Sequence, residues 1–205
     1  MVLLRRNILN IKNEIKRKLI HLLSLIYVFG YWYFPKYIVV YVLIITIIVV
    51  AIGEYMRFKV PNFNIFFKNN FKGFYRTTEI NKISGLIWTL LGALFTILIF
   101  HNKSIVFVSF LYFTFGDAAA ALAGKFYGKH KIYLITNKTF EGSLACFITC
   151  FISGLTIFNY KFAIIGAIIA MVIEAIPWEP NDNFWIQTIN AWLLTSLSNI
   201  MLWTK

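Results

Sequence analysis

A carboxylate, a row of small residues and a basic loop lie together in residues 116–130, GDAAAALAGKFYGKH. The stretch 104–115 that precedes them is almost entirely apolar. An ionisable group within such a stretch is costly in a bilayer and usually marks function, so Asp117 is the first candidate for chemistry. Gly116, Ala120 and Gly124 recur every four residues, a spacing that lets helices pack closely. We therefore expect a tightly packed helix face that forms a pocket, with Asp117 pointing into it.

The loop 124–143 adds cations and a helix start. Its basic residues are Lys125, Lys129, His130, Lys131 and Lys138. Its segment TNKTFEG leads into an apolar stretch, where the free N–H groups at the start of a helix would favour an anion. Lysines, a helix N-terminus and a deep carboxylate suit a Mg²⁺-bound polyphosphate. The alternative is that the lysines only set membrane topology and that the aspartate is unrelated to them. His130 is expected to be exposed and not catalytic.

The chain has eight carboxylates: Glu14, Glu54, Glu79, Asp117, Glu141, Glu174, Glu179 and Asp182. All of them fall on the same half of the topology derived below, which indicates a site that handles ions or phosphate. Glu14 and Glu179 are expected to be solvated.

Two spacings involve further charged residues. Glu54 stands three residues before Arg57, so the two could simply pair with each other. Arg17, Lys18 and His21 share one helix face, which suits either contact with phosphate or snorkelling at the membrane interface.

The composition indicates that lipid surrounds the elements that position these residues. Of the 205 residues, 60% are hydrophobic and 14% are charged, which is more apolar surface than a soluble domain of this size can bury. Seven apolar stretches approach the length needed to cross a bilayer: 19–34, 37–57, 83–100, 104–124, 140–158, 161–177 and 184–203. We expect an all-α polytopic integral membrane protein with about seven transmembrane helices and a single membrane-embedded domain, 1–205.

The basic residues predict the orientation of these helices. Sixteen of the 20 Lys and Arg residues lie before the first stretch, after the second or after the fourth. The positive-inside rule then places the N-terminus in the cytoplasm and the C-terminus outside. Residues 1–18 are expected to form a basic cytoplasmic segment, a helix lying on the membrane surface. The net charge of +12 is thus assigned mainly to membrane topology and not to binding of nucleic acid.

Residues 58–82 mix Lys and Arg with aromatic residues and either rest in the headgroup region or form an ordinary loop. Cys146 and Cys150 are expected to be buried thiols.

Taken together, these segments resemble the family of CTP-dependent lipid-alcohol kinases, which comprises dolichol kinase, phytol and farnesol kinase, and the CTP-type diacylglycerol kinase. The matching segments are RKLIH (17–21), EYMR (54–57), EINKISG (79–85), GDAAAALAGKFYG (116–128), NKTFEGS (137–143) and EAIPWEPNDN (174–183). The GDAAAALAGKFYG and NKTFEGS segments are specific as a pair, whereas RKLIH and EYMR are weak when taken alone. All six segments run in family order over most of the chain.

The resemblance implies transfer of the γ-phosphate of CTP to the hydroxyl of a membrane lipid alcohol: diacylglycerol, a polyprenol such as dolichol, or a shorter prenol. Asp117 and Glu174 would be the catalytic residues, either by holding Mg²⁺ or by activating the hydroxyl, and Asp182 would assist as a third metal ligand. The nucleotide-binding residues implied are Lys125, Lys129, Lys138, Thr139, Glu141, Gly142 and Asn183. Further candidates are Arg17, Lys18, His21, Glu54, Arg57 and Glu79.

The partners expected are CTP, Mg²⁺, the lipid alcohol and the bilayer itself. By default the membrane is a bacterial plasma membrane with the active site facing the cytoplasm, and an oligomer is compatible with the sequence. Two other functions compete. Phosphatidate cytidylyltransferases share a similar D…G…GK…KT.EG segment, but the Gly/His/Asp cluster of that family does not follow residues 174–183. An ion-coupled transporter would also use deep carboxylates, but charges confined to one half argue against alternating access.

Overall fold

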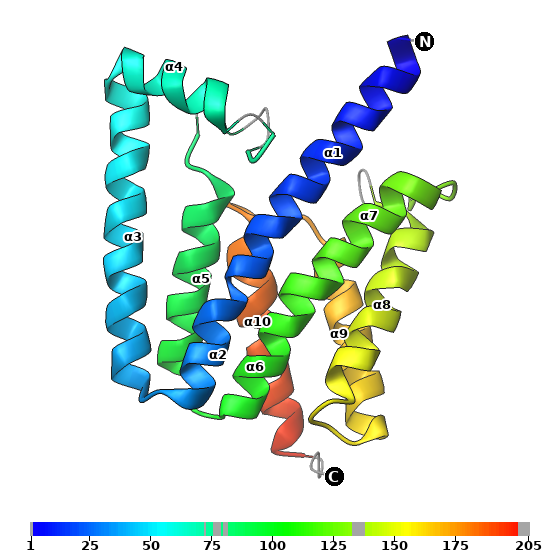
Figure 1. Ribbon diagram of the computed structural model, residues 1–205. Coiled ribbons are helices and arrows are strands. Elements are labelled where there is room, and N and C mark those ends of the chain that lie inside the picture. Colours follow the sequence, from blue (N-terminus) through cyan, green and yellow to red (C-terminus); the bar gives the residue numbers. More distant parts are fainter. Residues whose placement is uncertain (1, 72, 76–78, 80–81, 133–137, 201–205) are drawn as a thin grey trace.

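The computed structural model describes residues 2–71, 73–75, 79, 82–132 and 138–200, and its regular secondary structure is helical (Figure 1). The only exception among these residues is a single antiparallel bridge between Lys131 and Thr139. The helices are α1 (Val2–Leu23), α2 (Leu25–Tyr33), α3 (Lys36–Lys59), α4 (Pro61–Asn70), α5 (Gly85–Ile99), α6 (Lys103–Leu111), the π-helical turn η2 (Tyr112–Gly116), α7 (Asp117–Tyr127), α8 (Phe140–Gly154), α9 (Tyr160–Ala175) and α10 (Asp182–Ser198). The all-α class expected from the sequence is confirmed.

All seven apolar stretches of the sequence form helices, and two of them are divided. The stretch 104–124 becomes α6, η2 and α7. The first stretch is divided between α1 and α2, at Ser24, whose hydroxyl donates a 2.6 Å hydrogen bond to the carbonyl oxygen of His21. The basic segment is helical from Val2 onward, as expected. Because α1 continues through to Leu23, no structural boundary separates that segment from the first apolar stretch.

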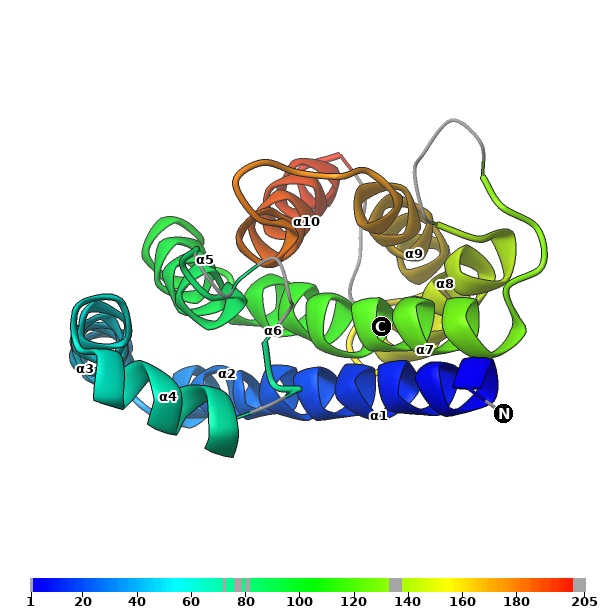
Figure 2. The same cartoon turned by 90° about the horizontal axis from the view of Figure 1, so that it is seen from above.

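The continuous rod of α6, η2 and α7 lies at the centre of the molecule (Figure 2). On one side of this rod, α1 packs against α7 and α2 packs against α6; on the other side lie α9 and α10. Helix α8 fills the angle between α7 and α9, while α5 joins α10 to α3. This arrangement brings the end of α1 close to the start of α7, although about a hundred residues separate them in the sequence.

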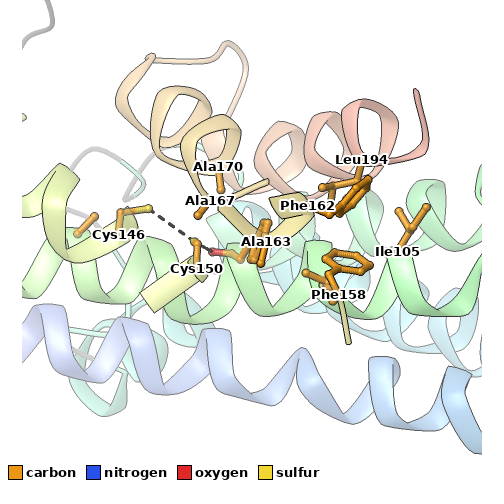
Figure 3. Close-up of a cluster of buried hydrophobic side chains, with 12 residues drawn as sticks. Ile105, Cys146, Cys150, Phe158, Phe162, Ala163, Ala167, Ala170 and Leu194 are labelled. Atoms are coloured by element: carbon orange, nitrogen blue, oxygen red, sulfur yellow. Dashed lines mark hydrogen bonds between the residues drawn. The ribbon is translucent and has the colours of Figure 1, made fainter. Parts of the chain in front are cut away.

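One core cluster joins α6, α8, α9 and α10 behind the central rod. Figure 3 shows Phe158, Phe162 and Leu194 packed beside Ile105, all of them buried. Cys146 and Cys150 belong to the same cluster as free, buried thiols whose sulfur atoms are 3.9 Å apart. The expectation of small buried thiols is confirmed.

The outer face of α3 is apolar and largely exposed. Within the described ranges, two segments are long and apolar enough to cross a membrane, Lys36–Lys59 and Lys103–Tyr127. Gly85–Ile99 and Phe140–Gly154 are shorter apolar helices. Only 11% of the most apolar part of Lys36–Lys59 is buried inside the protein, against 61% for Lys103–Tyr127. An apolar helix that is exposed in this way requires an apolar surrounding, and a bilayer provides one.

Helix α4 is an element that the sequence pattern did not predict within residues 58–82. Pro61 occupies its first turn, where a missing N–H costs nothing. The helix turns back from the end of α3 toward α1, across the end of the bundle (Figure 1). Residues of α1, α3, α4 and α5 together line a cavity at this end of the bundle.

Candidate active site

A cavity of about 230 Å³ opens where α1, α7, the start of α8, α9 and the start of α10 meet. Its wall combines acidic, basic and small residues: Glu14, Arg17, Lys18, Asp117, Ala120, Ala121, Gly124, Lys125, Lys138, Thr139, Gly142, Ser143, Glu174 and Asp182. The structure therefore brings together most of the candidates from the GD and NKTFEGS segments, together with Glu174 and Asp182.

Small residues make this cavity possible by letting α7 and α8 approach each other. A Cβ atom added at Gly142 would lie 2.8 Å from the carbonyl oxygen of Ala120 and 3.5 Å from the Cα atom of Gly124. The start of α8 is fixed by Thr139, whose side-chain oxygen accepts a 3.2 Å hydrogen bond from the backbone N–H of Gly142. The row of small residues is thus a packing face that also shapes the pocket, as expected.

Asp117 lies at the wall of the cavity and is held by two residues of α1. The ammonium group of Lys18 donates to its Oδ2 atom, and Nδ1 of His21 lies 3.3 Å from the same oxygen. Lys18 and His21 are both buried, and the His21 ring stacks on Phe113 with 5.0 Å between ring centroids. The helix face that Lys18 and His21 share therefore lies against Asp117.

A second acid–lysine pair lies in the same cavity. Lys138 donates to Oε1 of Glu174, a residue only 3% exposed. Burial alone would lower the pKa of Lys138, but the carboxylates of Glu174, Asp117 and Asp182 together raise it above its usual value, so the ammonium group stays charged at neutral pH. Oε2 of Glu174 and Oγ of Ser143 are buried, and neither has a hydrogen-bond partner in the described part of the chain. Unpaired buried polar atoms are costly, and a polar ligand in this cavity would satisfy them.

Glu14 is a site residue that the sequence reasoning missed. The expectation that it is solvated is wrong: it is 4% exposed, and its Oε2 atom accepts from Arg17 at 3.0 Å and from Lys125. Burial raises the pKa of Glu14, but the neighbouring cations Arg17, Lys125 and Lys18 lower it by more. The residue is buried because α1 packs along α7. A signal was present in the sequence, since Glu14 stands on the same helix face as Lys18 and His21.

Two other candidates in this region, Lys129 and Glu141, lie outside the cavity wall. Lys129 and His130 are exposed, as expected for His130. Glu141 accepts from the backbone N–H groups of both, at 3.2 Å each, and from the His130 ring at 2.7 Å. Glu141 therefore holds the loop before α8 in place. Glu179 is exposed, which confirms its expected solvation.

The remaining candidates surround a second, neighbouring cavity of about 300 Å³, which Asn183, Glu54, Glu79, His21 and Arg17 all line. Glu54 pairs with Arg57 at 2.5 Å, as the spacing predicted. Arg57 also donates to the backbone oxygens of Glu79 and Lys82, at 3.1 and 2.7 Å. Asn183 donates to the backbone oxygen of Gly85 at 3.2 Å. The structure thus places Asn183 beside the second cavity, away from the lysines expected to bind the nucleotide.

The carboxylates of the first cavity could hold a hard cation such as Mg²⁺ only if a bound ligand supplied further oxygen atoms. Among the residues that the structure describes, no group of three His, Cys, Asp or Glu side chains is arranged to hold a metal ion. Asp117, Glu174 and Asp182 do line one cavity, and Oδ1 of Asp182 accepts a 2.9 Å hydrogen bond from the backbone of Trp178. Mg²⁺ commonly takes one or two carboxylates and completes its shell with water and phosphate oxygens, and such a donor set is available here.

The fold is that of a helical protein with an apolar outer face suited to a lipid surrounding. Its site is a cavity in which lysines and carboxylates face one another. Comparison with curated proteins identifies relatives of this chain. The chain is 26% identical over 217 residues to CTP-dependent diacylglycerol kinase 1 of Saccharomyces cerevisiae, covering 91% of this chain and 74% of the yeast protein. It is 30% identical over 118 residues to CTP-dependent diacylglycerol kinase 1 of Eremothecium gossypii, covering 58% of this chain and 37% of that protein.

A third match, to CTP-dependent diacylglycerol kinase 1 of Schizosaccharomyces pombe, is 27% identical over 96 residues and covers 47% of this chain. No family model matches the chain, and no solved structure matches it. The chain is therefore a distant homologue of the CTP-dependent lipid kinases over most of its length, and the resemblance found in its motifs is confirmed. The homology and the apolar helices together indicate a membrane protein.

Proposed function

We propose that this protein transfers the γ-phosphate of CTP to the hydroxyl group of a membrane lipid alcohol, giving the lipid phosphate and CDP. One observation carries the proposal: in a homologue of CTP-dependent diacylglycerol kinase 1, four cations and four carboxylates line a single cavity. Diacylglycerol, the lipid in the names of the relatives, is the first acceptor to test, with a polyprenol and a shorter prenol as comparisons.

The first cavity suits the triphosphate of the donor. At about 230 Å³, it is smaller than the ~300–1,000 Å³ of pockets that enclose whole ligands, so the phosphates would enter while the nucleoside stays at the mouth. Arg17, Lys125 and Lys138 would neutralise their charge by exchanging carboxylate partners for phosphate oxygens. The unpaired Ser143 hydroxyl would donate to the phosphates. Phosphoryl transfer depends mainly on such positioning and charge neutralisation.

Asp117 stands where the acceptor hydroxyl must arrive. The hydroxyl oxygen attacks the γ-phosphorus in line with the departing CDP, the bond from that phosphorus to the β–γ bridging oxygen breaks, and Asp117 takes the hydroxyl proton. Lys18 and His21 hold the carboxylate in position through its Oδ2 atom. A bound Mg²⁺ ion would neutralise developing charge on the phosphate oxygens, and Asp117, Glu174 and Asp182 are the residues available to hold it.

The proposal includes a membrane arrangement. The seven apolar stretches cross the bilayer, with the N-terminus and the site on the cytoplasmic side and the C-terminus outside, in a bacterial plasma membrane. The distribution of Lys and Arg and the exposed apolar face of α3 support this arrangement. A site at headgroup depth would meet CTP from the water and the lipid hydroxyl from the bilayer.

A double-label experiment tests the activity. Purified protein is incubated with the lipid panel and CTP labelled either in the γ-phosphate or in the cytidine. We expect only the γ-label to enter the lipid. Cytidine label in the lipid would instead assign a cytidylyltransferase, and no label in any lipid would refute both activities.

A further inference from the structure

We propose that the second cavity, of about 300 Å³, is the acceptor site, which holds the apolar chain of the lipid alcohol and delivers its hydroxyl to Asp117. The inference rests on the proposed function and adds a binding site to it. The second cavity adjoins the first, has a wall rich in aromatic side chains, and lies beside the exposed face of α3.

The two cavities meet at α1. Arg17 lines both of them. His21, one turn further along α1, lines the second cavity, and its Nδ1 atom lies 3.3 Å from Oδ2 of Asp117 in the wall of the first. A hydroxyl at the inner end of the second cavity would therefore lie beside the carboxylate that is proposed to take its proton.

The wall of the second cavity is rich in aromatic side chains. Phe63, Phe67, Phe71, Phe74 and Tyr75 all come from α4 and the residues just after it. Phe67 stacks on Phe71 with ring centroids 4.9 Å apart and on Tyr75 with centroids 5.5 Å apart. Such a wall matches hydrocarbon far better than it matches a nucleotide phosphate. By contrast, none of the described residues that line the first cavity is aromatic.

Polar groups gather at the α3–α5 side of the same cavity and are held by partners inside the protein. Glu54 is fixed by Arg57 and accepts from the backbone N–H of Ser84 at 3.4 Å. Asn183 is fixed by the backbone of Gly85. A pocket with an apolar wall and a few fixed polar groups is the usual form of a site for an amphipathic small molecule, and a lipid alcohol has this character.

The position of the cavity gives the lipid a route into it. The cavity lies between α1, α3, α4 and α5, next to the exposed apolar face of α3 and beneath α4, which crosses the end of the bundle (Figure 1). A lipid entering beside α3 would keep its chain among the aromatic rings while its hydroxyl moves toward His21. This geometry gives α4 the role of one wall of the acceptor site.

Gly53 provides a direct way to fill the cavity. It lines the cavity from α3, and a Cβ atom added there would meet nothing within 4 Å, so the indole of a Gly53→Trp variant can enter the open space. The matched control is Ile52→Trp, one residue earlier, where the side chain is 55% exposed and does not line the cavity.

The experiment measures acceptor use and lipid contact in parallel. Phosphate transfer from CTP to diacylglycerol in mixed micelles gives the KM for the lipid, and equilibrium binding of labelled CTP gives the donor affinity. We expect Gly53→Trp to raise the KM for diacylglycerol about tenfold or more, as for a pocket that loses the burial of roughly two methylene groups. Its CTP affinity should match that of Ile52→Trp. In addition, a diacylglycerol that carries a diazirine on one acyl chain should label α4 and α3 residues of the wild type, and Gly53→Trp should lose this labelling.

The outcomes separate this inference from the proposed function. Normal lipid KM and normal labelling in Gly53→Trp, with an active wild type, would overturn the acceptor site and leave the kinase activity standing. Labelling at the second cavity in a wild type that transfers no phosphate would refute the kinase and leave a lipid site. Equal loss of CTP binding and lipid use would also overturn the assignment, because the cavity would then not be specific to the acceptor. Gly53→Leu places a smaller side chain in the same space, and it replaces the Trp variant if thermal unfolding in detergent shows that the latter is not folded.

Discussion

Replacing Asp117 with Asn separates the structural role of this residue from its chemical role. Asp117→Asn leaves the ammonium group of Lys18, which is 5% exposed, without its carboxylate partner. Removing one member of a buried ion pair costs about 3–5 kcal/mol of unfolding free energy. Lys18→Met should cost a similar amount, because it leaves the carboxylate unpaired except for His21. The double variant Asp117→Asn/Lys18→Met removes both charges, so it should be much closer to the wild type in stability than either single variant.

Turnover should behave differently from stability in the same cycle. Asparagine cannot accept the hydroxyl proton, and loss of a general base typically lowers the rate by about 10²–10⁴-fold. We therefore expect Asp117→Asn and the double variant to be equally inactive, even though the double variant regains stability. Unfolding in detergent gives the first quantity, and γ-phosphate transfer at saturating CTP and lipid gives the second. Glu179→Gln, at an exposed position, is the control and should change neither.

Recovery of both stability and turnover in the double variant would refute this reasoning. Such a result would mean that Asp117 only neutralises Lys18 and takes no part in the reaction. Unchanged stability in Asp117→Asn would contradict the buried ion pair itself.

Three further predictions test the rest of the site and the core. Gly142→Val should lower both the unfolding temperature and turnover, because its first side-chain carbon would stand 2.8 Å from the carbonyl oxygen of Ala120; Gly142→Ala should have the same effect to a smaller degree. The pKa of Glu14 is below its usual value of 4.5, since nearby cations outweigh its burial, so its contribution to stability is present above pH 4.5 and is lost as the pH falls through the lowered value. Glu14→Gln should therefore show a weaker loss of stability on acidification than the wild type, as measured by unfolding at a series of pH values. Cys146 and Cys150 are free and buried, so a maleimide should label them only after unfolding; rapid labelling of the folded protein would contradict the core packing.

The sequence predicted the helices and the central residues of the site for a clear physical reason. Apolar stretches of this length specify helices with little ambiguity, and each of the seven forms helix in the part of it that the structure describes. Charges are rare enough that their placement on the topology indicated a meeting point for Asp117, Glu174 and Lys138, and all three line one cavity.

The features that were missed depend on packing between distant segments. A glutamate in a basic, polar segment is expected to be solvated, and Glu14 is buried only because α1 packs against α7. The break at Ser24 and the π-helical turn before Asp117 have no periodic signal that would predict them. Likewise, α4 and the aromatic cavity beside it depend on where Pro61–Asn70 lies relative to α1, α3 and α5, which a pattern of Phe and Lys does not specify.

The central claim is that CTP donates its terminal phosphate to a lipid hydroxyl at the site of Asp117. The most direct measurement quantifies both products after the purified protein is incubated with CTP, Mg²⁺ and diacylglycerol in mixed micelles. We predict CDP and lipid monophosphate in equal amounts, with both formed about 10²–10⁴-fold more slowly by Asp117→Asn. Release of pyrophosphate together with a cytidine-bearing lipid, or formation of CDP without any phosphorylated lipid, would contradict the account.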